Sequence, residues 1–220
     1  MLQAILRCLP IDIGHIRTIK IMIGLLGFSL LLQLITFTTP GWLVYKNAEM
    51  EQAMYMALMY HVQCDQGVCT TYPIYVDVSK KDDWQYQYVS WIVKGSVPIL
   101  FCSLSLFILL FSLRKPKWRE PFFFFCTWIL GIATVLQWDL MAPFADIHRR
   151  SISEGGFLGN SYPLPWNVIL HSFSAFLTTT VMLASLVILM KKLIVNVMAN
   201  DRMEEPIMTN PDEADAGTRF

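Results

Sequence analysis

Four long stretches of the chain carry almost no charge, and each is long enough to cross a lipid bilayer as a helix. They are residues 21–39, 91–113, 121–141 and 166–190, with Lys94 and Asp139 as the charged residues inside them. Crossing the hydrocarbon layer takes about 20 predominantly apolar residues. The chain is 55% hydrophobic and 15% charged, so it has too little polar sequence to cover four such helices in water. The sequence therefore predicts a membrane protein with four spans, embedded in a lipid bilayer.

Basic residues gather in the segments on one side of these spans. They are Arg7, Arg17, Lys20, Arg114, Lys115, Lys117, Arg119, Lys191 and Lys192. Short cytoplasmic segments are rich in lysine and arginine, so we expect this side, with both termini, to be cytoplasmic. The expected organisation is a four-span domain over 1–192 with outer loops at 40–90 and 142–165. A disordered cytoplasmic tail is expected over 193–220, and the plasma membrane is the expected location.

The first outer loop contains a strand pattern. From Thr71 to Val78, apolar side chains occupy every second position, which is the period of a half-buried strand. Residues 54–63 are the expected partner strand, and Asp65-Gln66-Gly67-Val68 is the expected turn between them. A helix over 49–63 is the alternative, because that stretch is rich in methionine, alanine and leucine. The alternation favours the strands, and with them a small antiparallel sheet outside the membrane.

Two of the five cysteines, Cys64 and Cys69, lie in the first outer loop and flank the expected turn. Disulfides persist in oxidising compartments such as the cell exterior, so we expect these two residues to be bonded to each other. Two free thiols or a metal pair are the alternatives, but no histidine and cysteine set with metal-ligand spacing accompanies the pair. The cysteines within spans, Cys102 and Cys126, are expected to be packing residues.

Three polar residues, Lys94, Asp139 and His171, fall near the outer membrane surface at similar depth. Ionisable groups inside a membrane usually face the bundle interior and find partners. Lys94 and Asp139 are expected to form a pair that holds two helices together, with an ion or ligand path as the alternative.

Four tryptophans are expected at the outer boundary of the membrane, where amphipathic rings belong: Trp42, Trp91, Trp138 and Trp166.

Motifs for catalysis and cofactor binding are not found in the sequence. It has no glycine-rich phosphate loop and no HExxH zinc motif, so we expect neither an enzyme nor a cofactor. The formal net charge is zero, which gives no reason to expect nucleic acid as a partner.

The chain ends in Thr218-Arg219-Phe220, with a hydroxyl residue two positions before an apolar last residue. That pattern predicts a ligand for a PDZ-domain scaffold, which captures C-terminal carboxylates.

The segment Thr39-Pro40-Gly41-Trp42 at the end of the first span, followed by Cys64 and Cys69, resembles the claudin superfamily. That group includes claudins, peripheral myelin and epithelial membrane proteins, and auxiliary subunits of calcium channels and glutamate receptors. Where the family pattern has Gly-Leu-Trp this chain has Met59-Tyr60-His61, and its two cysteines are closer together. The chain thus resembles a divergent member, and the resemblance extends over the layout of nearly the whole chain.

The resemblance implies a four-helix membrane bundle with a small extracellular antiparallel β-sheet, built mainly from the first outer loop. It also implies a non-enzymatic organiser that acts in cell–cell contact or in a junctional barrier. Such a protein associates with itself or with other four-span proteins. The alternative that the resemblance allows is an auxiliary subunit, which controls the trafficking or gating of an ion channel or receptor.

Overall fold

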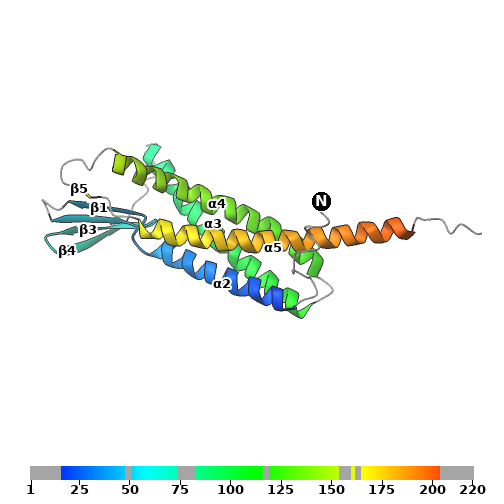
Figure 1. Ribbon diagram of the computed structural model, residues 1–220. Helices are drawn as coiled ribbons and strands as arrows, with labels where there is room; N and C mark the ends of the chain where they lie inside the picture. Colours follow the sequence, from blue (N-terminus) through cyan, green and yellow to red (C-terminus); the bar gives the residue numbers. More distant parts are fainter. Residues whose placement is uncertain are drawn as a thin grey trace, which may run out of the picture.

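Four long helices run side by side and carry a small β-sheet at one end (Figure 1). The computed structural model describes residues 16–47, 51–73, 83–115, 119–153, 160–161 and 165–203. The helices are α2 (Ile16–Thr38), α3 (Asp83–Arg114), α4 (Arg119–Ser153) and α5 (Trp166–Met203). Each contains a segment long and apolar enough to cross a membrane, at Ile16–Thr38, Val89–Arg114, Arg119–Arg150 and Trp166–Val195. These are the helices of a multi-pass membrane protein.

The outward surface of the helices carries many large apolar side chains. Leu100, Phe107 and Val135 are each about two-thirds exposed, and many other large apolar side chains on the helices are exposed as well. Soluble monomers rarely expose contiguous apolar patches above a few hundred Å². A surface of this kind is compatible with lipid rather than water, because lipid chains are as apolar as leucine.

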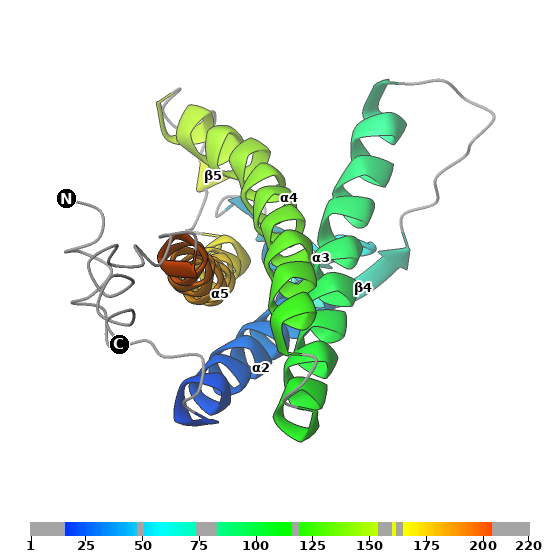
Figure 2. The same cartoon turned by 90° about the vertical axis from the view of Figure 1, so that its right-hand side faces the viewer.

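Figure 2 looks along α5, which lies beside α4 and α2. Helix α3 packs against α2 and α4, and α5 packs against α4 and α2. The main core lies between them and consists of buried residues from all four helices, among them Leu26, Leu109, Phe123, Leu130 and Val181. Short connections between consecutive helices make them antiparallel neighbours, and the gap between α3 and α4 spans only a few residues.

The sheet has five antiparallel strands in the order β4-β3-β2-β1-β5. They are β1 (Leu43–Asn47), β2 (Gln52–Met56), β3 (Tyr60–Asp65), β4 (Val68–Pro73) and β5 (Asn160–Ser161). The prediction that the first loop forms strands is confirmed as far as Pro73, and the alternative of a helix over 49–63 is wrong. Strand β5 comes from the second loop, where the sequence pattern indicated none.

The expected partner strand over 54–63 is in fact two strands joined by a tight turn. The backbone N–H of Ala57 donates to the carbonyl of Tyr60 at 2.8 Å, which closes the turn between β2 and β3. Leu58, at the tip of that turn, is buried in a core cluster with Trp42. Burial of one leucine therefore breaks the continuous strand that the pattern predicted. At the other end, β4 stops at Pro73, and the rest of the expected 71–78 strand lies outside the described residues.

All four helices extend beyond their expected spans, and α2 begins at Ile16 rather than at residue 21. Helix α3 begins at Asp83, inside the expected 40–90 loop, and α4 continues through Pro143 to Ser153, so the first half of the expected 142–165 loop is helical. An ion pair between Asp146 and Arg150, 2.7 Å apart, joins successive turns of this extension. Helix α5 runs to Met203, so residues 193–203 are helical where a disordered tail was expected. Residues 204–220 lie outside the described part of the chain.

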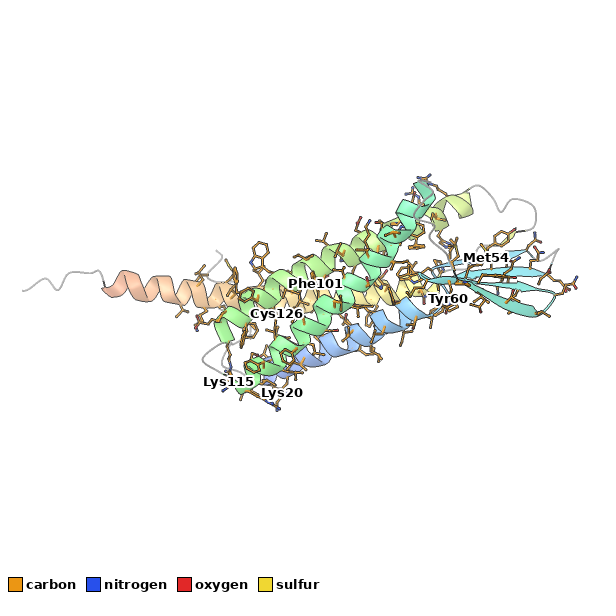
Figure 3. The ribbon with its side chains drawn as sticks, turned by 180° about the vertical axis from the view of Figure 1, so that it is seen from behind. Lys20, Met54, Tyr60, Phe101, Lys115 and Cys126 are labelled. Atoms are coloured by element: carbon orange, nitrogen blue, oxygen red, sulfur yellow. A yellow bond between two sulfur atoms is a disulfide. The ribbon has the colours of Figure 1, made fainter. Side chains whose placement is uncertain are left out.

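The two ends of the bundle differ in chemistry. Figure 3 shows Lys20 and Lys115 near one end, and Met54 and Tyr60 of the sheet near the other. We call the first the basic end, defined by Lys20, Arg114, Lys115, Arg119, Lys191 and Lys192, and the second the sheet end. The sequence assigned seven of the described basic residues to one side of the membrane. Six of them define the basic end, and the seventh, Arg17, lies in the first turn of α2.

Candidate functional site

The carbonyl groups at the end of α2 are bound by side chains from three other parts of the chain. A helix leaves its last four carbonyls without partners in the helix itself. The Trp42 Nε1–H donates to the carbonyl of Thr36 at 2.7 Å, and the Tyr60 hydroxyl donates to that of Thr38 at 2.8 Å. The Asn167 Nδ2 group donates to the carbonyl of Thr39 at 2.7 Å and to that of Thr36 at 3.3 Å. We call this arrangement the joint, because it ties the sheet and α5 to the end of α2.

Trp42 fills the space beneath the sheet. Its side chain is completely buried, and its ring centroid lies 5.0 Å from Phe144 and 5.1 Å from His171. Phe144 in turn lies 4.8 Å from Trp91. With Leu58 and Leu140, these aromatic residues form a second core at the sheet end. Trp42 and Trp91 are therefore core residues, and of the four expected boundary tryptophans only Trp138 and Trp166 are exposed.

Backbone shape at Gly41 permits this packing. Gly41 has φ of +151°, a conformation that side chains rarely adopt, and a Cβ there would overlap the indole ring of Trp166. Its backbone N–H donates to the carbonyl of Met56 at 2.9 Å, and its carbonyl accepts from the Asn167 N–H at 3.3 Å. Glycine at this position thus lets the chain pass between the end of α2, the sheet and the start of α5.

Lys94 and Asp139 form the expected ion pair, with Nζ and Oδ2 2.7 Å apart. The pair joins α3 to α4 near the sheet end. Lys94 is about one-quarter exposed and Asp139 about half exposed, so the pair lies at the surface of the bundle. His171 does not join it. That residue is buried, with Nδ1 3.2 Å from the Thr36 hydroxyl and its ring against Trp42.

We predict that Lys94→Met and Asp139→Asn each lower delivery of the protein to the cell surface. Each change leaves the other charge without its partner in a region of low dielectric, which costs more than the intact pair contributes. The exchange Lys94→Asp with Asp139→Lys restores opposite charges and is expected to recover part of the delivery. Surface biotinylation measures the effect, and unchanged delivery of both single variants would show that the pair is dispensable.

Uncharged polar side chains fill a seam between α2 and α5. The Ser29 hydroxyl donates to the Ser174 carbonyl at 2.9 Å, and the Ser174 hydroxyl donates to the Ser29 carbonyl at 3.0 Å. Gln33 Nε2 lies 3.2 Å from the Ser29 Oγ and 3.4 Å from the Cys102 Sγ. Small residues let helix backbones approach closely, and hydroxyls bond across the interface. The seam therefore fastens α5 to α2, and Cys102 contributes to it beyond simple packing.

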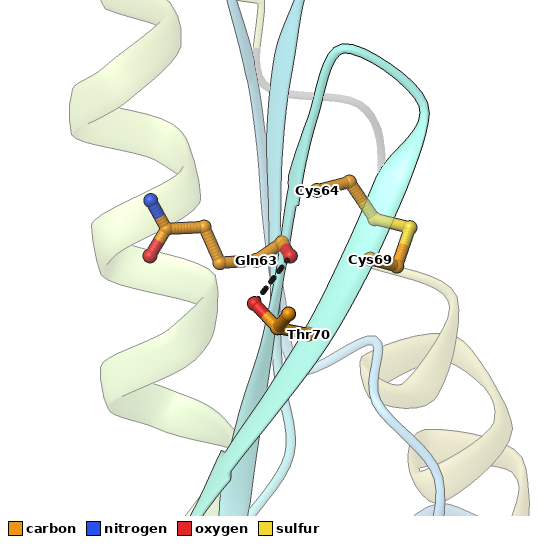
Figure 4. The surroundings of a disulfide bond; sticks show 4 residues. All are labelled: Gln63, Cys64, Cys69 and Thr70. Carbon is orange, nitrogen blue, oxygen red and sulfur yellow. Dashed lines mark hydrogen bonds between the residues drawn. A yellow bond between two sulfur atoms is a disulfide. The ribbon is translucent and has the colours of Figure 1, made fainter.

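The outer hairpin of the sheet is closed by a disulfide. Cys64 in β3 and Cys69 in β4 are directly opposite each other in the register, and they are bonded (Figure 4). The Thr70 hydroxyl donates to the Gln63 carbonyl at 3.4 Å beside it. Closing so short a loop contributes roughly 2 kcal/mol through the entropy of the unfolded chain. The bond thus fixes the hairpin that forms the outer edge of the sheet.

The remaining site residues of the sequence analysis have different outcomes. Thr218, Arg219 and Phe220 lie outside the described residues, so the PDZ ligand stays a prediction. Within the described ranges, no group of three or more His, Cys, Asp or Glu side chains could hold a metal ion. Asn167, Tyr60 and the serines of the seam were not singled out from the sequence. The seam has a sequence signal, because Asn167, His171, Ser174, Thr178 and Ser185 recur at helical spacing.

The joint, the ion pair and the seam are all structural contacts between elements. What the arrangement can do is hold a sheet rigidly above a bundle. Comparison with known proteins does not add a family: no protein-family model matches the chain, and no curated protein matches it either.

Proposed function

We propose that the protein is a non-enzymatic, claudin-like membrane organiser of the plasma membrane that acts in cell–cell contact or in a junctional barrier. In this proposal the basic end faces the cytoplasm and the sheet end faces the outside. Copies on opposing cells associate through the sheet. The orientation is supported by the basic residues at one end, since lysine and arginine are enriched in cytoplasmic segments.

The observation that carries the proposal is the exposure of β4 at the outer edge of the sheet. Every residue from Val68 to Pro73 is exposed, and β4 is the last strand in the sheet order. An edge strand presents backbone N–H and C=O groups that can pair with another chain, and adding a strand to a sheet edge is a common mode of protein association. Val68 is 69% exposed, which adds apolar surface at the same edge.

The joint supports the proposal in a second way. A contact surface must keep its position relative to the membrane, and the sheet is tied to α2 and α5 by Trp42, Tyr60 and Asn167. The disulfide between Cys64 and Cys69 fixes the edge hairpin itself. A binding surface held in its bound geometry loses less conformational entropy on association.

Cells that express a fluorescently tagged form, mixed with cells that do not, test this function. We expect the protein to concentrate at borders between two expressing cells and to remain diffuse at borders with non-expressing cells. Val68→Lys places a charge at the edge, which blocks edge pairing, and is expected to abolish the enrichment. Val68→Thr keeps a β-branched side chain without charge and is the matched control.

Two outcomes would contradict the proposal. Diffuse distribution at all borders, with the tagged protein present at the surface, would leave no role in cell contact. Enrichment that follows a co-expressed channel or receptor, and not the expressing neighbour, would favour an auxiliary subunit. Equal enrichment of Val68→Lys and Val68→Thr would show that the contact does not use the β4 edge.

A further inference from the structure

Polar side chains from all four helices meet around one buried thiol inside the bundle. The Gln33 Nε2 of α2 lies 3.4 Å from the Cys102 Sγ of α3. The Gln137 Nε2 of α4 and the Thr178 Oγ1 of α5 each lie 4.0 Å from the same sulfur. None of these four side chains is more than 1% exposed. We call Gln33, Cys102, Gln137 and Thr178 the polar centre.

Each of the two glutamines at the polar centre has one polar atom without a protein partner. The Gln33 Oε1 and the Gln137 Oε1 are shielded from solvent, and neither accepts a hydrogen bond from a described residue. The large majority of buried polar side-chain atoms in native proteins are hydrogen-bonded, either to protein or to ordered water. A buried acceptor without a partner carries its full desolvation penalty. The two amide oxygens therefore call for donors that the described residues do not supply.

A donor for these oxygens must be small, neutral and able to form several hydrogen bonds. Both oxygens lie near the same sulfur, because each shares a carbon with an amide nitrogen that contacts it. The side chains of the polar centre are uncharged, and burying a cation among uncharged groups is costly. Water meets these requirements, since it donates two hydrogen bonds and accepts others. Buried waters typically make about three hydrogen bonds to polar groups that otherwise lack partners.

We propose that the polar centre binds ordered water, which donates to the Gln33 Oε1 and the Gln137 Oε1 and accepts from the Cys102 thiol. Helix α2 packs closely against α3 and α5, and α4 packs closely against the same two helices. Helices α2 and α4 therefore lie diagonally across the bundle. The bound water forms a polar bridge along that diagonal. The site is independent of the sheet and of the proposed role in cell contact.

Radiolysis by a brief X-ray pulse tests the proposal on the full chain in nanodiscs. The pulse splits water into hydroxyl radicals, which oxidise a neighbouring sulfur before they diffuse away. Cys102 lies at the polar centre, whereas Met22 is buried among apolar residues of the main core. Peptide mass spectrometry measures both oxidation rates. Each rate is divided by the rate of the same residue in the denatured chain, which corrects for intrinsic reactivity. We expect the corrected rate of Cys102 to exceed that of Met22.

Two pairs of substitutions show whether the amides hold the water. Gln33→Leu with Gln137→Leu removes both amides from the polar centre, and the corrected rate of Cys102 is expected to fall to that of Met22. Gln52→Leu with Gln63→Leu makes the same change in β2 and β3, outside the bundle, and should leave the Cys102 rate unchanged. If the first pair does not fold, Gln137→Leu alone is compared with Gln52→Leu alone.

A thiol-reactive dye applied to the native protein shows whether bulk solvent reaches Cys102. We expect no labelling, although radiolysis oxidises the same thiol. Equal corrected rates for Cys102 and Met22 in the wild type would show that the polar centre is dry. Oxidation of Cys102 that persists without the amides, or dye labelling of the native protein, would show that the radicals arise elsewhere. Each of these results would overturn the proposal, and the first needs no variant to fold.

Discussion

Replacing Trp42 with alanine is expected to cost about 3–5 kcal/mol of stability, the usual range for deleting a buried tryptophan. The indole ring is completely buried and packs against Phe144 and His171. Its removal leaves a cavity between the sheet and the bundle, and it also removes the hydrogen bond to the Thr36 carbonyl. For a chain of this length, a loss of that size corresponds to a fall in Tm of roughly 6–20 °C.

Two buried thiols in the bundle provide the measurement. Cys102 and Cys126 are completely buried and free, so a thiol-reactive dye labels them only when the bundle opens on heating. The experiment is done in a Cys8→Ser background, so that Cys8 does not react. Trp128→Ala is the control, because Trp128 is 64% exposed and its loss should change stability by no more than about 0.5 kcal/mol. A Tm for Trp42→Ala equal to that of Trp128→Ala would contradict the described packing.

Trp42→Phe separates the two contributions of the side chain. Phenylalanine keeps an aromatic ring in the core but lacks the Nε1–H. The Thr36 carbonyl still receives a bond from Asn167 at 3.3 Å, so the carbonyl is not left without a donor. We therefore expect Trp42→Phe to lie between the wild type and Trp42→Ala, with a cost of about 1–3 kcal/mol.

The features that could be predicted from the sequence are those with a local signal. A span is recognised from a long apolar run, and all four runs became helices in the structure. The disulfide follows from two cysteines five residues apart around a turn. The Lys94–Asp139 pair follows from two opposite charges at similar depth in consecutive spans. In each case the prediction needs only a few neighbouring residues, or the depth of two residues counted along their spans.

The features that could not be predicted depend on contacts between distant segments. Helix α4 continues past Pro143 because Phe144 is buried against Trp42 and Trp91, and local sequence suggested a loop. The turn between β2 and β3 forms where Leu58 enters the same core. The role of Asn167 depends on where α2 ends, because the Asn167 side chain donates to the Thr39 carbonyl, far away in the sequence. These residues all surround the joint, where three parts of the chain meet.

The seam between α2 and α5 is an intermediate case. Its residues recur at helical spacing along α5, which is the pattern of a polar stripe on one helix face. That pattern predicts a helix–helix contact but does not name the partner helix. Only the structure shows that Ser174 exchanges hydrogen bonds with Ser29 of α2. The stripe was visible in the sequence, and its partner was not.

Gly41→Ala is expected to have the other large effect, through two separate costs. The φ of +151° at Gly41 strains any side chain, at about 1–3 kcal/mol. The new Cβ would also overlap the Trp166 ring, and relieving such an overlap costs about 1–3 kcal/mol. Moving the backbone instead would disturb the bonds from the Gly41 N–H to Met56 and from Asn167 to the Gly41 carbonyl.

Four further variants divide these costs in the same thiol-exposure assay. Gly67→Ala has a positive φ of 81° with nothing within 4 Å, so it carries strain alone and should cost at most about 1–2 kcal/mol. Gly27→Ala, in open space within α2, has neither cost and should raise stability slightly, because alanine favours helix. Gly41→Ala combined with Trp166→Ala removes the overlap but keeps the strain. Adding Gly41→Ala to the Trp166→Ala variant should therefore cost less stability than adding Gly41→Ala to the wild type. If both losses are equal, the close approach of Gly41 to Trp166 does not determine the choice of glycine, and the backbone conformation alone explains it.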